Sequence, residues 1–264
     1  MKKTDSWRTI ESGINSAAWN MAVDEALLNS FREGDLPILR LYGWEPALSA
    51  GRFSKLENSI DMEKLKKKNI SCVRRMSGGG ILVHGGDLSY SLIMPRKSVR
   101  QKGVKESYRT VCGFLIRLYH GIGYTAEYAC DTEYELSHSD ICLAGNESYD
   151  ILIGGKKIGG NAQRYTREAV FQHGSIPMRL EPSLFQSCFY GNSGLERAES
   201  LENLGILMTR DQLSQHLKEA FCKTFGVNTL PDTLNESEVR CAEELLASKY
   251  TNERWNIHGE SIYP

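Results

Sequence analysis

Glycine clusters divide the first two thirds of the chain into short apolar runs, and this feature constrains the fold most. Residues 71–95 read SCVRRMSGGGILVHGGDLSYSLIMP, and residues 150–163 read DILIGGKKIGGNAQ. Glycine readily adopts the positive φ angles of tight turns, so these runs are typical of strands joined by turns. We expect residues 71–77 and 80–95 to form two strands joined by a glycine turn. Gly154 and Gly155 in particular predict a two-residue hairpin turn between two apolar strands.

Helical patterns lie between and after these strands. Residues 16–35 and 104–120 carry apolar side chains at helical spacing. Residues 209–226 open with a capping box and end at a glycine, and residues 235–250 form a last helix.

This order of elements predicts an α+β fold with a mixed sheet and a helical C-terminal part from about residue 180. The sequence has no internal repeat and no proline-rich linker. We therefore expect a single domain over residues 1–264.

Composition and charge argue against several classes of protein. Hydrophobic residues make up 41% of the chain and charged residues 25%, which is ordinary for a soluble globular protein. The net charge of −1 argues against nucleic acid or an anionic membrane as a partner. The first residues do not form a signal peptide, and no apolar run is long enough to span a membrane, so we expect a cytoplasmic protein.

The cysteines predict neither a disulfide framework nor a metal site. There are seven of them, at wide spacings and without a CxxC pair, so we expect no bound metal. Cys142 differs from the others because SHSDICLAGNESYD, residues 137–150, is polar and rich in turn formers. Such surroundings favour a reactive thiolate, although an ordinary exposed thiol is the alternative.

The segment RRMSGGGILVHGGDLSYS, residues 74–91, is a candidate binding segment. Three consecutive glycines let backbone N–H groups approach a ligand closely, and Arg74 and Arg75 could pair with a phosphate or a carboxylate. The spacing matches neither a P-loop nor a dinucleotide-binding fingerprint. A plain glycine turn is the alternative, as a structural hydrogen bond is for His84.

Taken in order, several segments resemble one known family. They are NMAVDEALL, RLYGWEPALSAGRF, RRMSGGGILVHGGDLSYS, GGKKIGGNAQ, FQHGSIP and SKYTNERWN, and they extend over nearly the whole chain. The chain resembles the lipoate-protein ligase A and octanoyltransferase family, which is related to biotin-protein ligase catalytic domains. The resemblance implies a mixed, largely antiparallel sheet flanked by helices, with the acyl chain in a tunnel beside the RR-GGG segment.

The resemblance also implies roles for particular residues. Lys157 matches the family lysine that lies over the acyl carbonyl, whereas Lys156 takes the more variable place before it. Cys142 occupies the place of the nucleophile in the cysteine-dependent transferases. The remaining matches imply an acyl-binding set: Arg74, Arg75, Gly78, Gly79, Gly80, His84, Gly159, Gly160, Asn161, Ala162 and His173.

Two activities follow from the resemblance. The first is an octanoyltransferase that needs no cofactor and moves an octanoyl group from acyl carrier protein, through a cysteine thioester, to a lysine of a lipoyl carrier domain. Glycine cleavage H protein and 2-oxoacid dehydrogenase E2 carry such domains. The alternative is a lipoate-protein ligase that uses ATP and Mg to make a lipoyl-adenylate. The HGGD spacing favours the transferase, whereas the third glycine of RRMSGGG is typical of ligases.

Overall fold

The computed structural model describes residues 6–99, 104–132, 149–191, 193–195 and 198–261. Its main feature is a six-stranded mixed sheet with the strand order β10-β11-β6-β2-β1-β12. Strands β10, β11, β6 and β2 pair antiparallel, and β2, β1 and β12 pair parallel. The bounds are β1 Ser6–Asn15, β2 Ile38–Trp44, β6 Asp87–Pro95, β10 Gly160–Tyr165, β11 Ala169–Pro177 and β12 Asn228–Asp232.

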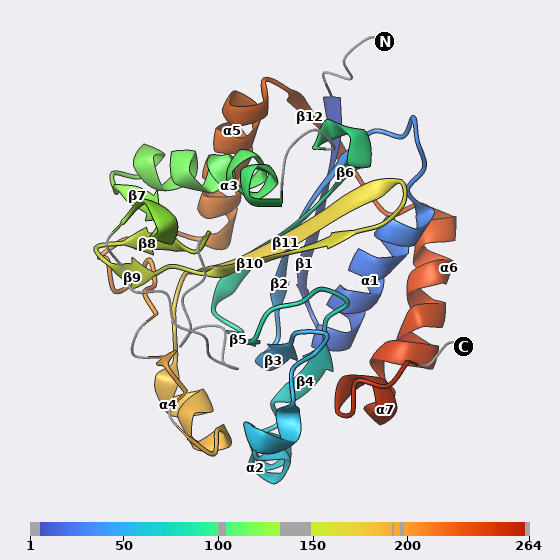
Figure 1. Ribbon diagram of the computed structural model, residues 1–264, viewed down its shortest axis with the longest axis vertical. Helices are drawn as coiled ribbons and strands as arrows, with labels where there is room; N and C mark the ends of the chain where they lie inside the picture. Colours follow the sequence, from blue (N-terminus) through green and yellow to red (C-terminus); the bar gives the residue numbers. More distant parts are fainter. Residues whose placement is uncertain (1–5, 100–103, 133–148, 192, 196–197, 262–264) are drawn as a thin grey trace.

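Two small sheets accompany the large one. The first has the order β4-β3-β5 and lies below the large sheet in Figure 1. The second has the order β7-β8-β9 and lies at the left in the same view. Their bounds are β3 Ala47–Ala50, β4 Ser71–Arg74, β5 Ile81–His84, β7 Ala126–Tyr128, β8 Ile151–Ile153 and β9 Lys156–Lys157.

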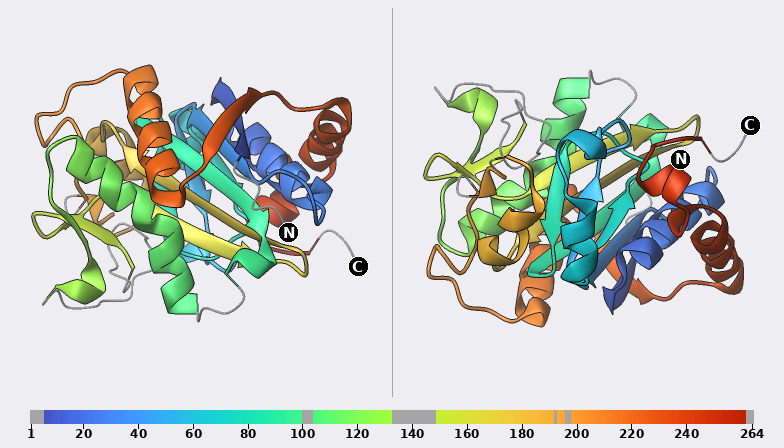
Figure 2. Two further views of the ribbon diagram at one scale, coloured as in Figure 1. Left: turned by 90° about the horizontal axis from the view of Figure 1, so that it is seen from above. Right: turned by 90° about the horizontal axis from the view of Figure 1, so that it is seen from below.

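Helices cover both faces of the large sheet, as Figures 1 and 2 show. Helices α3 and α5 lie on one side and pack through Phe114 and Phe221, whereas α1 and α6 lie on the other side. The bounds are α1 Ala17–Ser30, α2 Met62–Lys67, α3 Val104–Gly121, α4 Pro182–Phe185, α5 Arg210–Phe225, α6 Glu236–Leu245 and α7 Glu253–Asn256. A π-helical turn, Leu246–Tyr250, joins α6 to the segment before α7.

The predicted fold class is confirmed, and several local predictions are confirmed with it. Gly154 and Gly155 have φ angles of 57° and 77° and connect β8 to β9. Helix α5 begins with the predicted capping box, in which Thr209 and Gln212 cap each other. It ends at Gly226 in the left-handed conformation, which an L side chain adopts only with strain.

Two features of the sheet differ from the sequence reading. The apolar run from residue 81 to 95 is not one strand: it breaks at Gly85, whose φ is 128°, and β5 and β6 join different sheets. The C-terminal part is not purely helical, because β12 pairs in parallel with β1. Strand β12 is mostly exposed and contains Pro231, so it lacks the apolar alternation that marks a strand in sequence.

Candidate active site

A narrow cavity, about 20 Å³ in volume, lies between the large sheet and the β4-β3-β5 sheet. The sequence-predicted residues that line it are Arg75, Gly79, His84, Gly160, Asn161, Ala162 and His173. Residues not predicted also line it, namely Tyr42, Trp44, Ser49, Leu82, Ser89, Gly174 and Ser175.

The exposure of the lining residues shows which end of the cavity is closed and which end is open. Tyr42, Trp44 and Ser89 are each at most 3% exposed, so they form the closed end. Gly79 is exposed, and Asn161 and Ala162 are partly exposed, so the cavity opens beside the triple glycine and the start of β10. A ligand that enters there has its leading end beside the buried aromatic side chains.

A line of hydrogen bonds crosses one wall of the cavity from a guanidinium to a carboxylate. Arg75 donates from one terminal nitrogen to Ser49 Oγ at 2.8 Å. Ser49 Oγ lies 2.7 Å from His84 Nε2, and His84 Nδ1 lies 2.9 Å from Asp87 Oδ2. The indole of Trp44 stacks on the His84 ring, with 4.0 Å between the ring centroids, and fixes its plane.

The direction of two of these hydrogen bonds follows from the chemistry of the groups. A guanidinium can only donate, so Ser49 Oγ accepts from Arg75. An ionised carboxylate can only accept, so the N–H at His84 Nδ1 donates to Asp87. Burial raises the pKa of Asp87, but the His84 ring and the hydrogen bonds from Gly85 and Ser175 outweigh burial and hold that pKa below its ordinary value.

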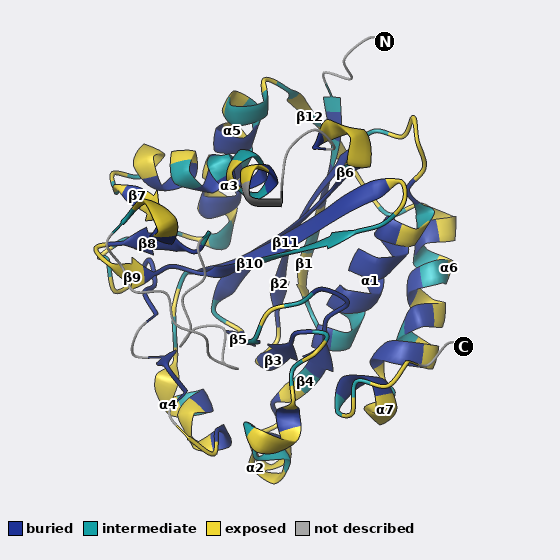
Figure 3. Ribbon diagram, viewed as in Figure 1, coloured by how far each residue is buried: buried dark blue, intermediate teal, exposed yellow. Residues whose placement is uncertain are grey.

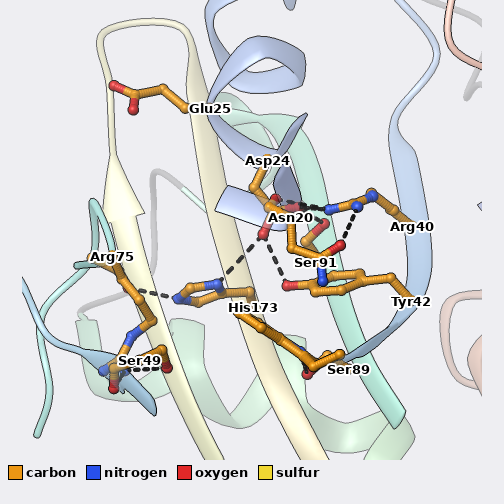
Figure 4. A network of polar contacts seen from close by, with 12 residues as sticks. Asn20, Asp24, Glu25, Arg40, Tyr42, Ser49, Arg75, Ser89, Ser91 and His173 are labelled. Atoms are coloured by element: carbon orange, nitrogen blue, oxygen red, sulfur yellow. Dashed lines mark hydrogen bonds and ion pairs between the residues drawn. The ribbon is translucent and has the colours of Figure 1, made fainter. Parts of the chain in front are cut away.

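A second polar network lies beside the closed end, and Figure 4 shows it around Asp24. The Asp24 carboxylate accepts from Arg40 at 2.7 Å, from the Tyr42 hydroxyl at 2.9 Å and from Ser91 Oγ at 2.8 Å. His173 Nδ1 lies 3.6 Å from Asp24 Oδ2. Burial raises the pKa of Asp24, but the Arg40 charge leads the effects that outweigh burial and hold that pKa below its ordinary value.

His173 connects this network to the triple-glycine segment. Its Nε2 lies 2.6 Å from Ser77 Oγ, immediately before Gly78. Burial, followed by the Arg75 charge, lowers the pKa of His173 despite Asp24, so the ring is neutral at pH 7. The two networks thus hold polar side chains of the cavity wall in fixed positions, and the buried aromatic side chains at the closed end suit an apolar chain.

The two adjacent arginines, predicted as a pair, have different surroundings. Arg75 donates to the Gly78 and Gly80 carbonyl groups and holds the triple-glycine loop in shape. Arg74 does not line the cavity, because its side chain donates to five backbone carbonyl groups, among them those of Trp255 and Ile257. These contacts give Arg74 a structural role: it ties β4 to the C-terminal segment.

The glycine loop packs tightly against a second loop. A Cβ added to Gly51 would lie 1.8 Å from the carbonyl oxygen of Gly79, and Gly51 N donates to the Gly80 carbonyl group. Gly79 itself has a φ of 92°. The cavity mouth therefore depends on two backbones that approach more closely than a side chain permits.

The two lysines of the hairpin also differ. Lys157 is 2% exposed, and its Nζ lies 2.7 Å from Asp150 Oδ2, whereas the Lys156 side chain is 54% exposed and lies near Glu199. Lys157 does not line the cavity described above, but only two residues separate it from Gly160, which does. Gly159, one of those two, has a φ of 89° and turns the chain into β10.

Cys142 lies outside the described residues, so its place in the site stays a prediction. The sequence reading missed Asp24, Asp87 and Asp150, the carboxylates that accept from Arg40, His84 and Lys157. The signal for Asp24 is its position in NMAVDEALL, one helical turn after Asn20 and among apolar residues. Asp150 opens the quoted hairpin segment but carries no pattern of its own.

In the part of the chain that the structure describes, no group of three or more His, Cys, Asp or Glu could hold a metal ion. Within the same residues, no helix is long and apolar enough to cross a membrane.

Comparison with known proteins identifies the class to which this fold and site belong. The lipoyl protein ligase A/B catalytic domain family matches residues 16–226, so the chain belongs to that family. The resemblance read from the motifs is thereby confirmed.

Relatives of known name narrow the assignment within the family. Octanoyltransferase LipM of Geobacillus kaustophilus is 36% identical, covering 95% of this chain and 98% of its own. Octanoyltransferase LipM of Bacillus subtilis is 31% identical, and the alignment covers 96% of this chain and 98% of that protein.

Solved structures of the same fold include ligases. A lipoate-protein ligase A bound with ATP has a TM-score of 0.83 and 25% identity, and covers 97% of this chain and 100% of its own. A putative lipoate protein ligase from T. acidophilum with bound lipoic acid has a TM-score of 0.82 and 26% identity, and covers 96% and 99%.

Proposed function

We propose that this protein takes an octanoyl group from acyl carrier protein onto Cys142 and passes it to a lysine of a lipoyl carrier domain. Octanoyl transfer in protein lipoylation is the activity of the protein, and the full-length similarity to the LipM octanoyltransferases is the observation that carries it. The donor, the cysteine and the acceptor are the parts that we add. Candidate acceptors are glycine cleavage H protein and 2-oxoacid dehydrogenase E2.

The cavity supports the binding of an octanoyl chain. Its closed end is aromatic, and several polar side chains of its walls are hydrogen-bonded to one another. The hydrocarbon chain of a thioester needs no hydrogen-bond partner there. Burial of the chain is favourable by about 0.8 kcal/mol for each CH₂ group.

The cysteine step conserves the activated bond. The Cys142 thiolate attacks the donor thioester, the carbon–sulfur bond to the carrier breaks, and the carrier thiolate leaves and takes up a proton. The acceptor amine then attacks the new thioester, releases the Cys142 thiolate and loses a proton to form the amide. The position of Cys142, eight residues before Asp150 and fifteen before Lys157, supports this role.

Lys157 is the group that we assign to the acyl carbonyl. In both steps a tetrahedral intermediate places negative charge on the carbonyl oxygen, and a buried ammonium can bind that charge. The ion pair with Asp150 supports the role, because it holds Lys157 in a dry environment with its charge balanced. Lys156, on the exposed side of the strand, is not part of this proposal.

An ATP-dependent lipoate ligase is the second candidate, and the ATP-bound structure of the same fold favours it. Such an enzyme would activate a free acid with ATP and Mg and would not need Cys142.

One experiment separates the two activities. The protein is incubated with octanoyl acyl carrier protein without ATP, and its intact mass is measured. We expect one added octanoyl group, which hydroxylamine removes, on the wild type and on Cys130→Ser, the control at an exposed thiol. Cys142→Ser should remain unmodified. Strict dependence on ATP with a free acid, together with normal activity of Cys142→Ser, would establish the ligase instead.

A further inference from the structure

Basic residues gather in one projecting part of the molecule. Residues 52–68, here called the basic lobe, contain six basic and three acidic residues, a net charge of +3. The rest of the chain has 26 basic and 30 acidic residues, a net charge of −4. The lobe comprises a 3₁₀ turn, Leu56–Asn58, and helix α2, and it forms the lower tip of the molecule in Figure 1.

The basic lobe borders the mouth of the acyl cavity. Its first residue, Arg52, donates its backbone N–H to the Ser77 carbonyl group at 2.8 Å, and Ser54 Oγ donates to the Gly79 carbonyl group at 3.2 Å. Gly79 is exposed and lines the cavity. A partner seated on the lobe therefore lies beside the entrance.

Three of the lysines carry charges that the described protein does not neutralise. Lys64 lies 3.2 Å from Asp61, and Lys68 reaches carbonyl groups near α4. Lys55, Lys66 and Lys67 are exposed and form no ion pair within the described ranges. Figure 3 shows the exposure of α2 to solvent.

Exposed aromatic side chains accompany these charges. Phe53 is 84% exposed, the highest value among the large exposed hydrophobic side chains of the described residues, and Tyr190 is 63% exposed. Tyr190 adjoins the lobe because its backbone N–H donates to the Ser59 carbonyl group at 3.1 Å. Exposed aromatic side chains surrounded by charged ones are typical of protein interfaces, where they become buried when the partner binds.

We propose that the basic lobe docks the donor carrier domain, which presents the octanoyl thioester at the cavity mouth on an anionic arm. The proposal rests on the function proposed above, and it adds the surface that selects the donor. The two carriers differ in chemistry. The donor carries the octanoyl thioester on a phosphopantetheine arm whose phosphodiester is an anion, whereas the acceptor presents a lysine. A positive surface beside the mouth attracts the phosphodiester and repels the ammonium of the acceptor lysine.

Direct binding tests the proposal independently of the transfer chemistry. Binding of octanoyl acyl carrier protein is measured by fluorescence anisotropy at low and at high salt. The test variant is Lys66→Glu with Lys67→Glu. The matched control is Lys223→Glu with Arg240→Glu, two exposed positions on α5 and α6 that change the net charge equally.

We expect the Kd of the test variant to rise roughly tenfold or more at low salt and the difference to shrink at high salt, because exposed charges are screened. The control should bind like the wild type. Acylation by octanoyl-N-acetylcysteamine, which lacks both carrier and phosphate, should keep at least half of its rate in the test variant. Phe53→Ala should also weaken carrier binding.

Two results would overturn the docking proposal: equal binding by the test and control variants, or weakened binding of the acceptor domain with unchanged binding of the donor. Failure of the proposed function has a different signature, namely no acylation of the wild type by either thioester while the carrier still binds through the lobe.

Discussion

Replacement of Asp24 by asparagine should be among the most destabilising single changes in this protein. Asp24 is 1% exposed, and the Arg40 side chain that it neutralises has no exposed surface. An asparagine of the same shape can keep the hydrogen bonds from Arg40 and Ser91 through its remaining oxygen. What it cannot keep is the negative charge, so the Arg40 guanidinium stays buried without a counter-ion.

The magnitude follows from this geometry. Removal of one partner of a buried ion pair costs about 3–5 kcal/mol. A typical domain has only about 5–15 kcal/mol of total stability. We therefore expect Asp24→Asn to lose about 3–5 kcal/mol in urea denaturation. Asp232→Asn, which removes an exposed partner of Arg8, should lose at most about 1 kcal/mol.

The pH dependence gives the same prediction a second test. The pKa of Asp24 is lowered in the folded state, so its stabilising effect is complete above the pKa of the unfolded chain, about 3.9. The effect is lost as the pH falls through the folded pKa. The stability difference between wild type and Asp24→Asn should therefore narrow as the pH falls below about 4. A constant difference, or a loss under about 1 kcal/mol at pH 7, would refute the assignment of a buried charge pair.

Two further predictions concern the site itself. Lys157→Ala should lower the transfer rate by about 10²–10³, whereas Lys156→Ala should be mild; equal rates for the two variants would contradict the role of the buried lysine. Lys157→Ala also removes the partner of the buried Asp150 carboxylate, so its rate is measured on protein that circular dichroism shows to be folded. Gly51→Ala should raise the KM for octanoyl donors and cost about 1–3 kcal/mol, because its Cβ would meet the Gly79 carbonyl oxygen at 1.8 Å. Gly78→Ala, where a Cβ would meet nothing within 4 Å, is the control in thermal denaturation, and an equal loss there would contradict the packing argument.

Much of the fold could be predicted because local rules determine it. Glycine conformation determines the hairpin at Gly154 and Gly155, and capping determines the ends of helix α5. Both depend on a few neighbouring residues, so the sequence predicts them. The break at Gly85 was missed because glycines also occur inside strands, and only the pairing of β5 and β6 with different sheets shows the break. The parallel pairing of β1 with β12 joins residues over 200 positions apart, and no local pattern records it.

The site was only partly predictable for a similar reason. Arg74 and Arg75 are neighbours in sequence, but successive side chains of an extended segment point to opposite sides, so one holds the C-terminal segment and the other the cavity wall. Sequence cannot say which side faces the ligand. The sequence did not predict Asp24 and Asp87 as site residues. Their hydrogen-bond partners come within reach only when the sheet and the loops around it are packed.

The proposed mechanism requires that the acyl-enzyme at Cys142 is a true intermediate. The most direct measurement isolates the octanoylated protein, free of donor and ATP, and adds a lipoyl carrier domain. We predict that the enzyme loses its octanoyl mass at the rate at which the acceptor gains it, and that an acceptor without its lysine leaves the enzyme acylated. An acyl-enzyme that persists in the presence of the intact acceptor, or acceptor modification only after ATP is added, would contradict the account.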